Sequence, residues 1–224
     1  MSFAHSTGTI LAKELRTEFR SRELLGTTVV FVLIVIVLFS FTFNPTSSES
    51  RRFGPGLLWL AFLFAGSLML QPSFLREQTN DTLAALRLAP IDPFSILAGK
   101  MAANFLFLLL VELILLPVFA VLYNIAILPV LAPLVLVLAL GTVGLATTGT
   151  VFSAVAAQAR LRELLLPLLL LPVLAPVLVA STEATAGILR DPYELSTVWL
   201  TFLTAFDVVF LTAAWLFGEY LLEE

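Results

Sequence analysis

Residues 101–123 read MAANFLFLLLVELILLPVFAVLY, and this stretch decides the fold class. A helix needs about 20 mainly apolar residues to cross a bilayer, because its backbone groups must be satisfied within the segment. Five further stretches qualify, at residues 25–43, 56–73, 127–153, 164–181 and 198–218. The sequence therefore predicts an all-α, polytopic membrane protein with six transmembrane helices.

The composition agrees with this prediction. Of 224 residues, 59% are hydrophobic and 12% are charged, and the mean hydropathy of +1.03 is far above that of a soluble domain. The segments outside the spans are too short to bury a core, so residues 1–224 are predicted to form a single membrane domain. The net charge of -4 indicates no strongly charged partner such as nucleic acid.

The lysines and arginines predict the orientation, because they are enriched on the cytoplasmic side of membrane proteins. One side of the predicted spans carries Lys13, Arg16, Arg20, Arg22, Arg76, Arg87, Lys100, Arg160 and Arg162. The other side carries Arg51, Arg52 and Arg190. We therefore expect a multi-pass protein of a bacterial inner membrane with both termini in the cytoplasm. Residues 1–24 are polar and charged, so no cleaved signal peptide is expected.

Two polar segments on the predicted cytoplasmic side have helical features. Residues 9–24 form an amphipathic pattern, which predicts an interfacial helix or simply a solvated entrance to the first span. Its apolar side consists of Ile10, Leu11, Leu15 and Phe19. Residues 76–100 contain a leucine-sided stretch that Asn80 or Asp81 can cap, followed by Asp92 and Pro93 as N-cap and first residue of the next helix. This segment can be a docking element or only a connector.

Glycine and proline predict where helices break or pack closely. Turn residues from Pro45 to Gly56, including Gly54 and Pro55, predict an external loop, and residues 183–197 predict another. Span four carries small residues that let another helix approach, namely Gly141, Gly144 and Gly149. Span five carries three prolines and is predicted to be a broken helix that faces the protein interior or a gate. They are Pro167, Pro172 and Pro176.

The residue inventory excludes several kinds of chemistry. The chain has no cysteine and one histidine, His5, so thiolate metal sites, two-histidine zinc sites and haem ligation by a histidine pair cannot be built. The sequence contains no GxxxxGK[ST] phosphate loop. We therefore expect no catalytic site, no metal and no tightly bound cofactor, and any ATP must be hydrolysed by another polypeptide.

Two acids lie near the middle of predicted spans, Glu112 and Asp207. A charged side chain there costs about 2.5 to 3.5 kcal/mol on insertion scales, so such groups usually face the interior and have partners. We expect them to be protonated and hydrogen-bonded to each other or to Thr and Tyr, or paired across a subunit interface. They can gate, bind an ionic group or carry protons, or they can be structural links between helices.

Three stretches carry a resemblance to a known family: FGPGLLWLAFLFAGSLML (53–70), FLREQTNDTLAALRLAPIDPFSILAGKMAAN (74–104) and LRELLLPLLLLPVLAPVLVAS (161–181). The order of amphipathic helix, two spans, cytoplasmic helical segment and four spans resembles the membrane subunit of ABC-2-type exporters. More specifically, these stretches resemble CcmB, the permease subunit of the cytochrome c maturation system.

The resemblance implies a permease subunit that works with a separate ABC ATPase similar to CcmA, with two copies of each. It also implies a haem-handling membrane protein similar to CcmC and a periplasmic haem chaperone similar to CcmE. In that family, ATP hydrolysis is tied to haem export or to release of the haem-loaded chaperone. Haem is then a possible substrate of the complex, and ATP is bound by the partner subunit.

The resemblance also gives residues 76–93 a role, as a coupling helix that docks in the ATPase. Leu83 and Leu86 are expected to supply buried contact. The orienting charges at the rim are Arg76, Glu77, Asp81 and Arg87. Competing hypotheses are an ABC permease for another small molecule or lipid, a proton-coupled secondary transporter that uses Glu112 and Asp207, and a scaffold that transports nothing.

Overall fold

Six membrane-length helices and one helix across their ends make up the described part of the protein. The computed structural model describes residues 2–42, 48–74, 91–157, 162–190 and 194–223. Its helices are α1 (Phe3–Ser21), α2 (Glu23–Thr42), α3 (Ser48–Leu70), α6 (Pro93–Leu122), the 3-10 helix η1 (Leu128–Val130), α7 (Leu131–Ala157), α8 (Arg162–Ile188) and α9 (Thr197–Glu223). All but α1 and η1 are long and apolar enough to cross a membrane, which confirms the predicted six spans.

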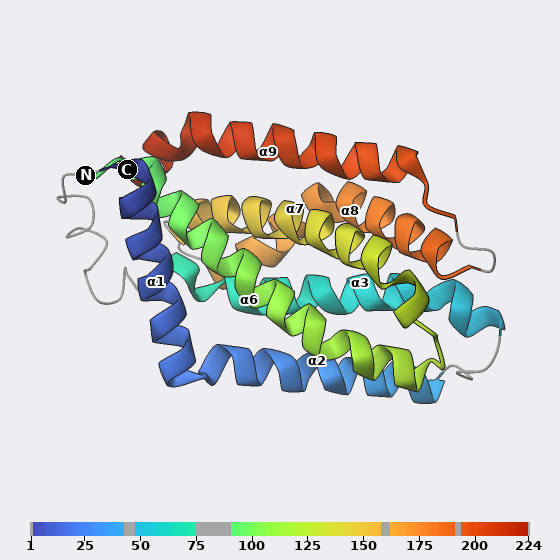
Figure 1. The fold of residues 1–224 in the computed structure, drawn as a ribbon. Helices are drawn as coiled ribbons and strands as arrows, with labels where there is room; N and C mark the ends of the chain where they lie inside the picture. Colours follow the sequence, from blue (N-terminus) through green and yellow to red (C-terminus); the bar gives the residue numbers. More distant parts are fainter. Residues whose placement is uncertain (1, 43–47, 75–90, 158–161, 191–193, 224) are drawn as a thin grey trace.

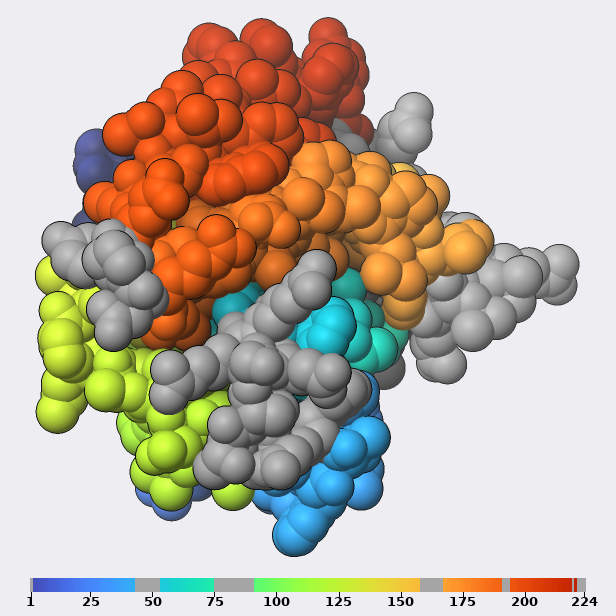
Figure 2. Space-filling model, turned by 90° about the vertical axis from the view of Figure 1, so that its right-hand side faces the viewer, coloured from blue at the N-terminus to red at the C-terminus, as the bar shows by residue number. Residues whose placement is uncertain are grey.

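The arrangement places α3 at the centre of the bundle and α9 at its edge. In Figure 1, α1 runs across one end of the bundle, where α9 also ends, and we call this the α1 end. Figure 2 views the opposite end, where cyan α3 lies between blue α2 and orange α8. Of the α3 span, 61% of residues are buried, against 17% for α9. The helix α9 is therefore the most peripheral of the six.

Small residues on α7 allow neighbouring helices to approach closely, as predicted. A Cβ atom on Gly141 would overlap the ring of Trp59 on α3, and one on Gly149 would overlap Leu70. The buried Trp59 Nε1 also donates a hydrogen bond of 2.9 Å to Thr185 Oγ1 on α8. These contacts fix α3 against α7 and α8, and van der Waals packing of this kind is the main source of stability between helices in lipid.

Helix ends near the α1 end are capped by side chains. The N-cap of α6 is Asp92, which accepts a hydrogen bond of 2.9 Å from the Phe94 backbone N–H, with Pro93 at the first position, as predicted. Between α1 and α2 the chain turns at Arg22, which has a φ of 56°. The Glu18 carboxylate accepts a hydrogen bond of 2.9 Å from the Leu25 N–H and so satisfies a donor in the first turn of α2. The corner between α1 and α2 is therefore short and bonded.

Two predicted loops are partly helical, and these predictions are wrong. Helix α3 already begins at Ser48, so Gly54 and Pro55 lie inside it, and α8 continues to Ile188. The small Gly54 packs against Phe119, whose ring would lie 3.2 Å from an added Cβ. Beyond residue 183, Ala184, Thr185 and Ile188 are buried in the bundle. Tertiary packing overrides weak helix propensity in both places.

Candidate functional site

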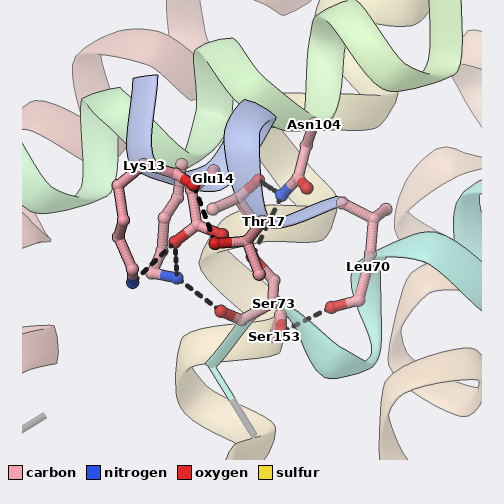
Figure 3. A network of polar contacts seen from close by, with 9 residues as sticks. Lys13, Glu14, Thr17, Leu70, Ser73, Asn104 and Ser153 are labelled. Carbon is pink, nitrogen blue, oxygen red and sulfur yellow. Dashed lines mark hydrogen bonds and ion pairs between the residues drawn. The ribbon is translucent and has the colours of Figure 1, made fainter. Parts of the chain in front are cut away.

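A buried polar cluster joins four segments at the α1 end of the bundle (Figure 3). We call it the Lys100 junction. It contains Glu14 from α1, Leu70, Ser73 and Phe74 from the end of span two, Lys100 and Asn104 from α6, and Thr150 and Ser153 from α7. Polar groups are costly to bury unless they are paired, so a cluster of this size at one point needs specific partners.

Lys100 is the centre of the junction. Its side chain is 1% exposed, and its Nζ donates hydrogen bonds to Glu14 Oε1 at 2.7 Å and to the Ser73 carbonyl at 2.5 Å. The same ammonium lies 4.9 Å from the centroid of the Phe74 ring, within the range of a cation–π interaction. One buried cation therefore bonds α1 and α6 to the chain that leaves α3.

A second layer of the junction satisfies the end of α3. Helix C-termini leave backbone carbonyls without partners in the helix. Ser153 Oγ on α7 donates a hydrogen bond of 2.7 Å to the carbonyl of Leu70, the last residue of α3. Asn104 Nδ2 donates to Thr150 Oγ1 at 2.9 Å and to Ser73 Oγ at 3.2 Å. Two helices, α6 and α7, thus hold the C-terminal end of α3 from two sides.

Gly99 explains why α1 can reach Lys100. A Cβ atom at Gly99 would lie 2.7 Å from Ile10 Cβ and 3.0 Å from the Thr7 carbonyl oxygen on α1. Two helices can cross this closely only where one of them lacks a side chain. Gly99 therefore sets the distance between α1 and α6 that the Glu14–Lys100 ion pair requires.

Electrostatics favour the ionised form of Glu14. Burial acts to raise the pKa of Glu14, but the ion pair and hydrogen bond with Lys100, and then those with Lys13, outweigh it. The pKa of Glu14 is therefore held below its ordinary value of 4.5. The carboxylate is charged at neutral pH and pairs with the buried ammonium of Lys100.

The predicted docking residues lie outside the described part of the chain. These are Arg76, Glu77, Asp81, Leu83, Leu86 and Arg87, and the structure describes nothing between residues 75 and 90. The junction nevertheless contains the residues on either side of that segment. Ser73 precedes it and Lys100 follows it, and the hydrogen bond between them ties the two flanks together.

The two intramembrane acids, Glu112 on α6 and Asp207 on α9, contact α7 at separate positions. Glu112 is 2% exposed, and both of its carboxylate oxygens lie 2.7 Å from Thr142 Oγ1, which confirms the expected threonine partner. Asp207 is 5% exposed and faces Gly144, whose added Cβ would lie 3.0 Å from Asp207 Oδ1. The two acids do not bond each other, and Asp207 turns into its own chain rather than toward a partner subunit. No group of three His, Asp or Glu side chains that could hold a metal occurs in the described ranges.

The prolines of span five do not break it. Helix α8 runs without interruption from Arg162 to Ile188 through Pro167, Pro172 and Pro176. The prediction of a broken helix is therefore wrong, and Pro172 and Pro176 are exposed on the outer side of α8. Each proline removes one backbone donor, and buried Leu170, Leu174 and Val177 on the inner side keep the helix packed. A gating role for the prolines stays a prediction.

Sequence reasoning missed the junction. The sequence pattern marks Lys100 as a cytoplasmic charge and gives no role to Glu14. A lysine beside a glycine in the first turns of a long apolar helix was the available signal, because such a cation must find a partner when the helix packs. Nothing in the sequence pattern identifies that partner as Glu14, which is 86 positions earlier in the chain.

Comparison with known proteins identifies the family. The family model described as CcmB protein matches residues 5–217. Heme exporter protein B of Pseudomonas aeruginosa is 33% identical over 199 residues, which cover 88% of this chain and 88% of that protein. The proteins of the same name from Rhodobacter capsulatus and Paracoccus denitrificans are 32% and 33% identical, and the matches cover 78% of this chain and 79% and 80% of theirs. With six membrane-length helices and a family match over nearly its whole length, the chain belongs to the CcmB protein family.

Proposed function

We propose that this chain is the permease subunit of an ABC transporter that exports haem for cytochrome c biogenesis. The relatives that it matches over most of their length carry the name Heme exporter protein B. The sequence contains no phosphate loop, so the energy comes from a separate ATPase subunit. Haem is the substrate of the complex in this proposal, and ATP stays on the partner.

The Lys100 junction is the observation that carries the mechanism. Residues 76–93 dock in the ATPase in this proposal, and both flanks of that segment meet at the bond between Lys100 Nζ and the Ser73 carbonyl. A loop with free flanks absorbs a displacement by changing its own shape. A loop with bonded flanks passes the displacement to the helices that hold it, which here are α3, α6 and, through Glu14, α1.

The proposed orientation follows from charge. The α1 end of the bundle lies in the cytoplasm, because it carries the larger share of lysine and arginine. The ATPase, in two copies with two copies of this chain, then docks on the α1 end. The haem-handling membrane protein and the periplasmic haem chaperone complete the assembly, and α1 lies along the lipid surface.

Two variants separate docking from force transmission. Leu83→Asp places a charge in the proposed docking contact and is expected to abolish co-purification of the ATPase in gentle detergent. Lys100→Met removes the bonds of the Lys100 junction but not the docking contact. The ATPase is therefore expected to co-purify, while cytochrome c assembly in cells is lost. Lys13→Met is the matched control, because this exposed lysine contacts the same carboxylate of Glu14.

The outcomes that contradict the proposal are equally specific. ATPase association and cytochrome c assembly that both survive Leu83→Asp would exclude docking through this segment. Normal cytochrome c assembly with Lys100→Met would exclude force transmission through the junction. If Leu83→Asp and Lys100→Met abolished transport of an unrelated molecule but left cytochrome c assembly intact, the chain would be an ABC permease for that other molecule.

A further inference from the structure

Asp207 is a buried acid that the proposed transport mechanism does not use. It lies on α9 and is 5% exposed. Among the residues that the structure describes, neither Asp207 oxygen has a hydrogen-bond partner. A Cβ atom added to Gly144 on α7 would lie 3.0 Å from Asp207 Oδ1 and 3.5 Å from the ring of Phe206, so this face of α7 packs against Asp207. The carboxyl group is thus enclosed without a partner.

No charged group in the surrounding helices is placed to balance an ionised Asp207. Helix α7 has no charged residue between Leu131 and Ala157. Helix α6 offers Glu112, which is held by Thr142, and Lys100, which is held by Glu14 and the Ser73 carbonyl. Helix α8 has charged residues only toward its ends, at Arg162, Glu163 and Glu183, and α9 has none besides Asp207 before Glu219. A negative charge would therefore be both buried and unpaired.

We propose that Asp207 is a proton-binding site, in which a neutral carboxylic acid is held between α9 and the Gly144 face of α7. A proton is the cation that one carboxyl group can bind alone, whereas Na⁺, Mg²⁺ or Ca²⁺ requires several oxygen ligands. The glycine is part of the site, because the Cβ atom of any other residue at position 144 would lie 3.0 Å from Asp207 Oδ1 and press on it.

The same face of α7 also offers a group for the proton to interact with. Thr148 follows Gly144 by four residues, so the two share a helix face and lie about 6 Å apart along the axis. Its hydroxyl is buried and has no hydrogen-bond partner in the described ranges. A displacement of α9 along α7 by about one helical turn would bring the acid and the hydroxyl together and give the proton a hydrogen-bonded alternative position.

Glu112 shows by contrast what a satisfied acid looks like in this bundle. The Thr142 hydroxyl has one hydrogen and lies 2.7 Å both from Glu112 and from the Leu138 carbonyl. Thr142 and Gly144 are two residues apart, which places them about 200° apart around α7. The two acids therefore contact opposite faces of one helix, and the site at Asp207 is independent of Glu112.

Helix α9 is the wall that closes the site. It is the least buried of the six spans and lies at the edge of the bundle. Its neighbouring side chains Val208 and Val209 point outward and are mostly exposed. We therefore infer that the Asp207 proton is retained while α9 is packed and exchanges when α9 moves away.

Infrared spectroscopy of the full chain in lipid nanodiscs tests the site. The wild type at neutral pH is expected to absorb at the carbonyl stretch of a neutral carboxylic acid. Asp207→Asn should lose the part of this absorption that Asp207 contributes, and Glu112→Gln should retain that part. Loss of carboxylate absorption in Asp207→Asn instead would overturn the proposal.

If Asp207→Asn does not fold, aspartate labelled with ¹³C at its carboxyl group replaces the variant. The other aspartates, Asp81, Asp92 and Asp191, lie outside the spans, so an acid band that shifts with the label belongs to Asp207.

Exchange into D₂O tests the closing wall. The acid band of the wild type is expected to shift slowly in D₂O, and Gly144→Ala should make the shift several-fold faster, because the added Cβ pushes the carboxyl group and α9 away. Gly26→Ala is the control, since a Cβ there meets nothing within 4 Å. An immediate shift in the wild type would overturn the closed site. None of these outcomes depends on the ATPase or on haem, so they test this inference separately from the proposed function.

Discussion

Lys100 on α6 and Glu14 on α1 are 86 residues apart in the sequence and 2.7 Å apart in the structure. The same carboxylate also receives Lys13 at 3.2 Å, but Lys13 is 45% exposed while Lys100 is 1% exposed. Removing one partner of a buried pair leaves the other charge buried and unpaired, whereas an exposed pair is screened by solvent. The junction thus allows a buried and an exposed lysine to be compared at the same carboxylate.

Lys100→Met is expected to lower the free energy of unfolding by about 3 to 5 kcal/mol, because it leaves the Glu14 carboxylate with only the exposed Lys13 and removes the donor to the Ser73 carbonyl. Lys13→Met is expected to cost less than about 1 kcal/mol. Reversible unfolding in detergent, followed by circular dichroism, measures both values. The double variant Glu14→Gln with Lys100→Met should recover much of the loss, and equal losses in the single and double variants would show that the charge pair is not the cause.

Acid is expected to weaken the junction. The folded pKa of Glu14 is lower than its ordinary value of 4.5, so its ionised form contributes stability above about pH 4.5. That contribution is lost as the pH falls through the lowered pKa of the folded state. The difference in unfolding free energy between wild type and Glu14→Gln, measured from neutral pH downward, should therefore shrink below pH 4.5. A constant difference across this range would contradict the assignment.

Gly141→Ala is expected to destabilise the bundle by about 1 to 3 kcal/mol, because overpacking forces Trp59 out of its position. Trp59 is fully buried and cannot move without losing its bond to Thr185. Gly26→Ala is the matched change in α2, where a Cβ meets nothing within 4 Å, and it should leave stability unchanged or slightly higher. Thermal unfolding in detergent and Trp fluorescence report on both, and identical melting of the two variants would argue against the close approach.

Thr185→Val is expected to cost about 1 to 3 kcal/mol, because the buried Trp59 Nε1 then has no acceptor. The valine keeps the shape of the side chain, so packing changes little. Thr204→Val is the control, since Thr204 is exposed and its hydroxyl bonds only the backbone of its own helix. That variant should stay within about 0.5 kcal/mol of wild type. A loss for Thr204→Val as large as that for Thr185→Val would mean that removing a hydroxyl, and not the tryptophan bond, is what matters.

The spans could be predicted because lipid imposes one simple requirement. A backbone that crosses hydrocarbon must be helical and long, so hydropathy alone locates all six spans. The Asp92 cap and the small residues of α7 were also readable, because caps and close packing act over one or two turns. By contrast, Gly54 and Pro55 in α3 and residues 183–188 in α8 became helical through packing against other helices. Local propensity cannot reveal contacts of that kind.

The candidate site was only half visible in the sequence. The acids Glu112 and Asp207 are conspicuous because charge in a span is rare. Their surroundings depend on which face of α7 each one meets, and two residues of offset between Thr142 and Gly144 separate a bonded acid from an unbonded one. The Lys100 junction depends on a crossing of α1 over Gly99, and the sequence does not contain the angle or position of that crossing.

The bonded corner at Arg22 and the crossing at Gly99 also order the biosynthesis of the chain. The ribosome releases α1 long before it releases residues 99 and 100, so until then the Glu14 carboxylate has only Lys13 of its own helix as an ionic partner. Helix α1 can pack at Gly99 and pair with Lys100 only after the third span has entered the membrane. We expect nascent chains arrested before residue 99 to be cleaved by trypsin at Arg16, and chains arrested after the third span has emerged to be protected there.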